Sequence, residues 1–307
     1  MKKIDLHLHT SYSDGEDSFR DIFEKIRRNN LSLFSICDHN YISYETIKTK
    51  NLANSNNITF LQGVEISCVD RVTGESLHVL GYSQDFDIRR LNEFLQPIVD
   101  EYNKRANKII EKLNNKYVGL KLDFNEIRQR KTEVYTSRNT IAAELIKFLG
   151  KEQITMKEAI KESFVEENDL WMIDSKEAIQ IINDAGGFAV IAHPGKIIKD
   201  VYAFESLLKR LIEFGIVGLE VFYPKHDKQM TNYLNHLSNL HNLAVTAGSD
   251  WHGENYTPSR TIGFTIEDKA YEKIFEVFKI RTLPRVQEWQ KIPDQSVLSL
   301  GHIGKPI

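Results

Sequence analysis

The sequence contains few residues of the kinds that cross-link a chain or carry it through a membrane. Its 307 residues include two cysteines, Cys37 and Cys68, which lie in separate apolar runs and do not form a CxxC pair. Two such thiols exclude a disulfide framework, and we expect both to be buried and unreactive. No stretch approaches the roughly 20 apolar residues that a transmembrane helix needs, so no membrane contact is expected.

The sequence also lacks a strong charge of one sign and a recognisable targeting segment. Its formal net charge is −3, without the global basic field of a dedicated nucleic-acid-binding protein. The first ten residues, MKKIDLHLHT, contain no long apolar stretch and no small-residue cleavage site, so a signal peptide is not expected. The expected location is therefore the reducing cytoplasm. Nothing in the sequence indicates an oligomeric state.

Two common catalytic motifs are missing as well. The sequence has no GxSxG nucleophile elbow and no phosphate-binding P-loop, which argues against a serine hydrolase of that type and against a P-loop NTPase. The hydrophobic share of 41% and the charged share of 27% are typical of a soluble globular protein.

The first third of the chain alternates between two hydrophobic patterns. Residues 18–30 have apolar side chains at helical spacing, whereas four other segments have the composition of strands: residues 3–10, 31–39, 58–67 and 76–83. Such alternation favours a parallel sheet or an α/β barrel.

The middle of the chain is helical and rich in charge, and then the alternation resumes. Residues 96–140 contain ten Lys or Arg and six Asp or Glu, a modest basic excess that suits either a solvated helical face or attraction of a nucleotide. We predict a barrel from residues 1–87 and 173–307, with a helical insertion at 88–172 that caps the active site. Three further strands are predicted at residues 188–195, 216–224 and 243–253, each after a helix.

Residue types that bind metals occur where the predicted strands end. Six of the ten histidines lie at or just beyond such ends, together with three carboxylates. Each histidine alone is explained equally well by a surface or core position, but the shared placement is not. Active sites of α/β barrels are built at the C-terminal ends of the strands. The nine candidate metal ligands are His7, His9, Asp14, His39, Glu65, His78, His193, Asp250 and His252.

The chemistry of this set points to a multinuclear site. His7 and His9 are two residues apart on a strand, so their rings share a face and can bind one ion. Imidazoles and carboxylates without thiolates suit Mn, Fe or Zn. Nine ligands suit two or three divalent ions, with a carboxylate such as Glu65 as a bridge. Clustered divalent ions stabilise the attacking and leaving oxygens in phosphoryl transfer and lower the pKa of bound water.

In this order, the motifs HLHTSYSDG, ICDHN, GVEIS, LHVLGY, AHPG and GSDWHG resemble those of the polymerase and histidinol phosphatase (PHP) superfamily. The resemblance implies a distorted (β/α)7 barrel of the TIM type with a trinuclear metal site. It implies three ligand groups. The first holds His7, His9, Glu65 and Asp250, the second Glu65, His78 and His193, and the third Asp14, His39 and His252.

Within that superfamily the chain resembles the branch of 3′,5′-nucleoside bisphosphate phosphatases, which includes a 5′→3′ exonuclease for short RNA. The segments SRNTIAAELI, NDAGGFAVIAHPG and GLEVFYPKHDKQ carry this resemblance. The branch usually has Arg-Pro-His where this chain has Arg138-Asn139-Thr140, and often Arg in place of Lys196. These departures concern the substrate and leave the metal ligands intact.

Four further residues are candidates for contact with a substrate phosphate: Arg138, Lys196, His226 and Arg260. A guanidinium can fork onto phosphate oxygens, and His226 can also protonate the leaving oxygen as a catalytic residue beside Glu65 and Asp250. For each, a surface or packing role is the alternative.

Residues next to the predicted ligands have expected roles of their own. Asp38 is expected to orient a ligand imidazole. For Tyr12 and Trp251, packing at the rim of the site is favoured over stacking on a base.

The sequence thus predicts a phosphoesterase that hydrolyses a phosphate monoester of a nucleotide or nucleoside 3′,5′-bisphosphate. A metal-bridging hydroxide is expected to attack phosphorus. The first alternative is a 5′–3′ exonuclease that cleaves phosphodiesters of a short oligonucleotide. The second is a non-catalytic module that is stabilised by its metals.

Overall fold

The computed structural model describes residues 1–130, 132–165 and 172–281, and the segment after Leu283, in which the sequence offers no motif, lies outside this range. Nine strands form one sheet, in the spatial order β8-β7-β6-β4-β3-β2-β1-β9, with β5 paired to β3. The strands are β1 (Lys2–Leu8), β2 (Leu33–Ile36), β3 (Thr59–Val69), β4 (Ser76–Ser83), β5 (Ile173–Asp174), β6 (Phe188–Ile191), β7 (Ile216–Phe222), β8 (Ala244–Ala247) and β9 (Phe264–Ile266).

The sheet curls into a nearly closed barrel. The segment that follows β8 returns to β1, where the backbone N–H of Asp250 donates to His7 at 2.8 Å and that of His9 donates to Trp251 at 2.9 Å. Strand β4 departs from a regular barrel, because it pairs antiparallel with both neighbours, β3 and β6. The predicted α/β barrel is confirmed, and the reversed β4 is its main distortion.

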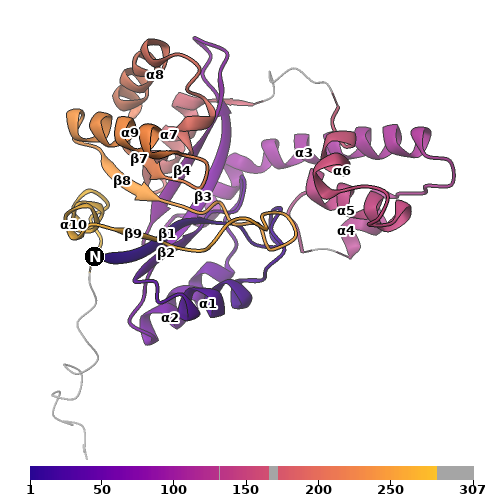
Figure 1. Cartoon of the computed structure of the whole chain (residues 1–307), viewed down its shortest axis with the longest axis horizontal. Helices are drawn as coiled ribbons and strands as arrows, with labels where there is room; N and C mark the ends of the chain where they lie inside the picture. The colour runs from indigo at the N-terminus through magenta and orange to yellow at the C-terminus, as the bar shows by residue number, and fades with distance from the viewer. Residues whose placement is uncertain (131, 166–171, 282–307) are drawn as a thin grey trace, which may run out of the picture.

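Helices cover the outside of the barrel (Figure 1). Helix α1 begins at a capping box formed by Ser18 and Asp21 and buries its predicted apolar face against β2. Helix α2 was not predicted, since its sequence is largely polar. The outer helices are α1 (Phe19–Arg28), α2 (Glu45–Ser55), α7 (Ser175–Asp184), α8 (Val201–Phe214), α9 (Lys228–Leu240) and α10 (Asp268–Val277).

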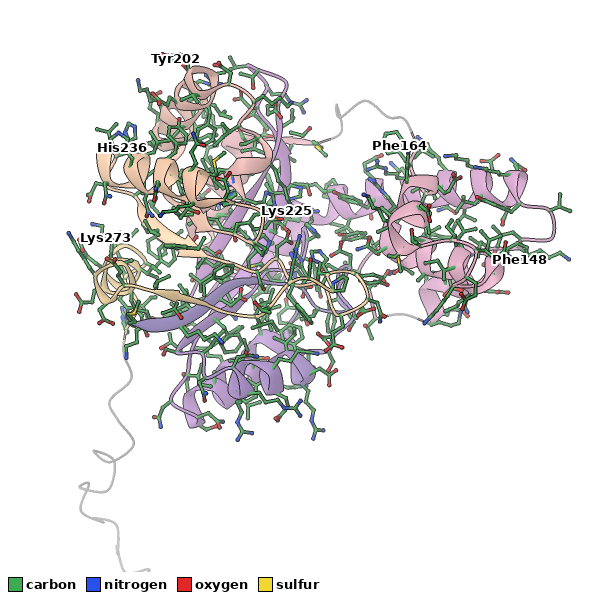
Figure 2. The ribbon with its side chains drawn as sticks, viewed as in Figure 1. Phe148, Phe164, Tyr202, Lys225, His236 and Lys273 are labelled. Carbon is green, nitrogen blue, oxygen red and sulfur yellow. The ribbon has the colours of Figure 1, made fainter. Side chains whose placement is uncertain are left out.

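In its described residues the predicted insertion consists of helices joined by loops, without a strand, and it projects from one side of the barrel (Figure 1). Its helices are α3 (Ile88–Lys116), α4 (Phe124–Gln129), α5 (Arg138–Leu149) and α6 (Met156–Glu162). The first half of α3 packs into the barrel core through Leu91 and Leu95, whereas its second half joins a separate core with Leu113. The side-chain view places Phe148 and Phe164 on this separate part (Figure 2). The exact domain boundaries stay a prediction, since α3 belongs to both cores.

Both cysteines are free and buried, as predicted, and burial raises the pKa of each thiol. Among the described helices, none combines the length and the apolar character that a membrane crossing requires.

Candidate metal centre and substrate pocket

The structure brings the nine candidate ligands together at one mouth of the barrel. Most follow the C-terminal end of a parallel strand, as predicted. His78 reaches the same place by a different route, because it lies near the start of the antiparallel strand β4, opposite Ser67 of β3. The reversed strand therefore presents its beginning where the other strands present their ends.

Glu65 lies at the centre of the cluster and is fully buried. One carboxylate oxygen lies 2.7 Å from His78 Nδ1 and 3.0 Å from His193 Nε2. The other lies 3.1 to 3.2 Å from nitrogens of three more imidazoles, those of His7, His9 and His39. Five imidazoles around one carboxylate is the arrangement expected of a ligand shared between ions.

Asp14 is the centre of a second group of contacts within the cluster, on the side of the helical insertion. Its Oδ1 lies 3.1 Å from His252 Nε2 and 3.8 Å from nitrogens of His9 and His39. The rings of His9 and His252 stack with centroids 4.1 Å apart. His9 and His39 connect this second group of contacts to Glu65.

The electrostatics of the cluster are those of a site short of positive charge. Burial opposes ionisation of Glu65, yet His7, His39 and His78 hold its pKa well below the usual range. Burial also opposes the charge on His9, but Asp250 and Glu65 raise the pKa of its imidazole to about 9. By contrast, burial lowers the pKa of His39 to about 3 and that of His193 to about 4. The carboxylates thus dominate the pKa of His9, whereas burial dominates the pKa of His39 and His193.

Divalent ions fit this donor set. Several buried nitrogens and oxygens of the cluster lack a hydrogen-bond partner: His7 Nε2, His9 Nδ1 and Nε2, His39 Nδ1, Glu65 Oε2 and His193 Nδ1. Each buried polar group without a hydrogen bond costs about 1–3 kcal/mol of folding free energy. So many such atoms in one cluster require a compensating partner. Imidazole and carboxylate donors without thiolates suit Mn, Fe or Zn.

The ligand groups agree with the expected ones in part. Three sets have donor atoms within 4.8 Å of one another: His7, His9, Glu65 and Asp250; His9, Asp14, His39 and His252; and His39, Glu65 and His78. The first is the expected group. The second adds His9 to an expected group, and the third contains His39 where His193 was expected. His193 still contacts Glu65, and its assignment to an ion remains a prediction.

Asp250 is held on its outer side by three donors. Its Oδ2 lies 3.0 Å from the hydroxyl of Tyr223, 3.3 Å from Lys196 Nζ and 3.0 Å from Arg260. Arg260 also donates to the backbone carbonyl of Asp250. The Arg260 guanidinium therefore contacts a candidate metal ligand and does not point into open space. The structure thus favours a supporting role for Arg260 over the predicted phosphate contact. Lys196 remains 40% exposed at the rim, where it can reach a phosphate.

The predicted catalytic and phosphate-binding roles of His226 do not agree with its contacts. Its Nδ1 donates to the carbonyl of Val221 at 2.9 Å, and its Nε2 accepts from the backbone N–H of Gly195 at 3.0 Å. Burial lowers its pKa, in keeping with a neutral ring. With both nitrogens bound to backbone, His226 has no proton to give a leaving oxygen, and it supports the turn after His193. A strand-end position did not reveal where the ring points.

The role predicted for Asp38 is also different from the observed one. Its carboxylate accepts hydrogen bonds from Thr10 and Ser13, including one of 2.8 Å from the Thr10 backbone, and so fixes the loop that carries Asp14. Tyr12 packs on Phe19, and Trp251 is buried with its indole N–H bound to Asp17, which agrees with the favoured packing roles.

A pocket of about 310 Å³ lies between the cluster and the insertion. Asp14, His39 and His78 line its barrel side, and Arg105 of α3 and Arg138 of α5 line the other. Desolvation and the nearby charge of Arg105 lower the pKa of Arg138, so the two guanidinium groups are neighbours. Arg138 thus lines the pocket beside candidate ligands, and its contact with a phosphate stays a prediction. Arg105 was missed, because α3 carries many charges and its sequence does not indicate which one faces the pocket.

The insertion is docked directly onto the metal cluster. Asn139 Nδ2 donates to Asp14 Oδ2 at 3.2 Å, and the Val134 N–H donates to the Tyr12 carbonyl at 2.8 Å. On the opposite side, the Tyr102 hydroxyl donates to Ser67 at 3.1 Å. Asn139 stands where the resembled branch has proline, and no motif indicated its contact with the candidate metal ligand Asp14.

Comparisons with known proteins agree with the observed fold. The family profile described as "PHP domain" matches residues 5–277. A phosphoribosyl 1,2-cyclic phosphate 1,2-diphosphodiesterase from Eggerthella lenta is 25% identical over 254 residues, which cover 81% of this chain and 94% of that protein. A 5′-3′ exoribonuclease from Haemophilus influenzae is 27% identical over 257 residues, 82% of this chain and 90% of that one.

A third relative and a solved structure are also similar to this chain. A 3′,5′-nucleoside bisphosphate phosphatase from Chromobacterium violaceum is 26% identical over 272 residues, 86% of this chain and 92% of that protein. The structure of an amidohydrolase from Chromobacterium violaceum with bound sulfate superposes with a TM-score of 0.71 at 22% identity, over 88% of this chain and 96% of that one. That similarity supports the fold.

Proposed function

Since the chain belongs to the PHP domain family and is a metal-dependent phosphoesterase, we propose that it removes a phosphate monoester from a nucleoside 3′,5′-bisphosphate or a similar nucleotide. One observation carries the proposal: the pocket joins candidate metal ligands on one wall to Arg105 and Arg138 on the other. A substrate with two phosphates can place one at each wall.

The chemistry divides between bound ions and the chain's own residues. When bound, two or three divalent ions supply Lewis acidity and a water of lowered pKa. The chain holds its ligands in place from several strands, with Glu65 at the centre and Asp250 fixed by Tyr223 and Arg260. Lys196, at the rim, is placed to bind an oxygen of the reacting phosphate.

The second phosphate is the basis of the proposed specificity. Two guanidinium groups close together in a partly desolvated pocket repel one another, and an anion between them removes the repulsion. Each charged hydrogen bond to a phosphate contributes about 1.5–3 kcal/mol. A nucleoside monophosphate whose phosphate occupies the metal cluster has no second phosphate to bind these two groups.

The test compares adenosine 3′,5′-bisphosphate with adenosine 3′-monophosphate on Mn²⁺-loaded protein, with phosphate release as the readout. We expect the bisphosphate to be preferred and Arg105→Met to lower its kcat/KM by about 10- to 100-fold, with little change for the monophosphate. Arg89→Met is the matched control, because Arg89 lies on the same helix, exposed and paired with Glu93. Absence of phosphate release from every ester tested would refute the proposal.

Phosphodiester cleavage of a short 5′-phosphorylated oligonucleotide is the second candidate. Lys225 lies on the side of the barrel that faces the insertion (Figure 2). Desolvation lowers its pKa, and so do the charges of Lys196, Arg260 and Lys157 of α6. Cations from both parts of the chain thus gather at the rim, which favours an extended anion. Release of mononucleotides from a trinucleotide, weakened by Lys157→Met, is the result that would support this candidate.

The third possibility, a module without catalytic activity, is set aside. The relatives named above are hydrolytic enzymes, and the candidate ligands converge in one buried cluster.

A further inference from the structure

The structure assigns a role to Glu220, a fully buried carboxylate of β7 that the sequence did not single out. Its Oε1 lies 2.9 Å from His7 Nδ1, and its Oε2 accepts the backbone N–H of His193 at 2.6 Å. We propose that Glu220 is a positioning residue that sets the affinity of the metal centre by orienting His7 and His193 at once. The inference rests on the metal chemistry proposed above.

Glu220 acts on His7 by selecting its tautomer. A carboxylate accepts hydrogen bonds and does not donate them, so His7 Nδ1 must carry the proton. His7 Nε2 is then the nitrogen that would bind an ion, and it lies beside the other carboxylates, 3.1 Å from Glu65 and 3.7 Å from Asp250. Outer carboxylates of this kind orient a ligand imidazole and raise its basicity.

Glu220 acts on His193 through the backbone. His193 has φ +28° and ψ +57°, a conformation that a residue with a Cβ rarely adopts. Its N–H is directed at Glu220, and this strained turn brings its ring nitrogen Nε2 within 3.0 Å of Glu65. Loss of the hydrogen bond would let the turn relax and move the imidazole away from the cluster.

The packing around Glu220 holds the carboxylate in this position. A Cβ added to Gly248 would lie 2.2 Å from Glu220 Oε1 and 2.2 Å from the Cβ of His7, so the glycine is required for the two side chains to meet. Both carboxylate oxygens are already occupied by N–H donors. Glu220 is therefore better suited to holding ligands than to binding an ion itself.

Glu220→Gln is the informative substitution, because glutamine has the same shape but one acceptor oxygen. Its amide nitrogen must face either His7 Nδ1 or the His193 N–H, so either one hydrogen bond is lost or His7 takes the tautomer with its proton on Nε2, which cannot bind an ion through that nitrogen. Titration of metal-free protein with Mn²⁺ should show affinity lowered by about 10- to 100-fold. At saturating Mn²⁺, kcat should recover to within a few-fold and KM for the phosphate ester should be unchanged.

Asp70→Asn is the matched control, since Asp70 is also a buried carboxylate and is held by Thr73 and Arg210 away from the cluster. It should lower the melting temperature without changing Mn²⁺ affinity. Unchanged Mn²⁺ affinity in folded Glu220→Gln would overturn the proposal. Mn²⁺ affinity does not depend on any substrate, so the outcome is independent of whether the proposed esterase activity is found.

The position of the His7 ring proton can be measured in the wild-type protein, so this test needs no variant. In Zn²⁺-loaded wild-type protein labelled with ¹⁵N-histidine, NMR should show the His7 proton on Nδ1. A proton on Nε2 would contradict the proposal even if Glu220→Gln fails to fold.

Discussion

At the scale of single residues, Glu65 has the greatest influence on the candidate site. It is buried among five imidazoles, and each of its two carboxylate oxygens contacts a different subset of them. No other carboxylate of the cluster contacts as many candidate ligands. Its substitution should therefore affect more than one ion.

We expect Glu65→Gln to lower both metal content and activity. The neutral amide removes the charge that the surrounding imidazoles require and turns one acceptor into a donor. Because loss of an outer partner already costs 10- to 100-fold in affinity or activity, a central ligand should cost at least about 100-fold. Metal analysis and kcat measure the two effects. Full activity with fewer ions bound would show that Glu65 is not a bridging ligand.

Gly248→Ala tests the packing that brings Glu220 to His7. The added methyl group would overlap both side chains, and such overpacking costs about 1–3 kcal/mol. We expect a lower melting temperature and weaker Mn²⁺ binding. Gly74→Ala is the control, because Gly74 has φ +72° but no atom within 4 Å of an added Cβ. That variant should lose stability through backbone strain and keep its Mn²⁺ affinity.

Sequence reasoning located the candidate ligands better than their surroundings. Histidines just after an apolar strand stand out, so His193 could be singled out, whereas Glu65, which lies inside β3, was singled out by the motif GVEIS. Glu220 could not, because one acid inside a strand looks the same whether it faces solvent or the barrel interior. The ring direction of His226 was likewise inaccessible, since two backbone contacts determine it.

At the scale of secondary-structure elements, α3 connects the two parts of the molecule. Its first half packs into the barrel core, and its second half lies in the core of the insertion. Arg105 lies beyond the middle of the helix and faces the substrate pocket. A change in the insertion core should therefore be felt at the substrate and not at the metals.

Leu113→Ala tests this separation. Leu113 is fully buried in the insertion core, and removal of such a side chain costs about 2–5 kcal/mol. We expect a higher KM and unchanged metal content. Leu240→Ala, at an exposed position on α9, should change neither. Loss of bound metal in Leu113→Ala would show that the two parts are more tightly coupled than their separate cores suggest.

The direction of β4 and the presence of α2 are among the features that were not foreseen from the sequence. The alternation of apolar and polar residues in β4 indicates a strand but carries no information about its direction. The short loop before it allows a hairpin, and β4 indeed runs antiparallel to β3. Helix α2 escaped prediction because its polar sequence has only a weak apolar face, with Ala53 its one fully buried apolar side chain.

At the scale of the whole molecule, the metal centre and the barrel support each other. Candidate ligands come from the ends of most barrel strands, so bound ions would tie those strands together. Removal of the ions would leave the orphaned nitrogens and oxygens of the cluster without partners.

We expect chelation to abolish activity and to lower the melting temperature. Ligand present at 100 times its dissociation constant stabilises the folded state by about 2.7 kcal/mol. Calorimetry with and without chelator measures the shift, and addition of Mn²⁺, Fe²⁺ or Zn²⁺ should restore both properties. A melting temperature that is identical in both conditions would contradict metal binding at this cluster.

The closure of the barrel also determines when the centre can form during synthesis. His7 and His9 are translated about 240 residues before Asp250 and His252. The two pairs meet only when the segment after β8 returns to β1. A nascent chain that still lacks this segment has no complete cluster, so the full set of ions can bind only after nearly all of the barrel has left the ribosome.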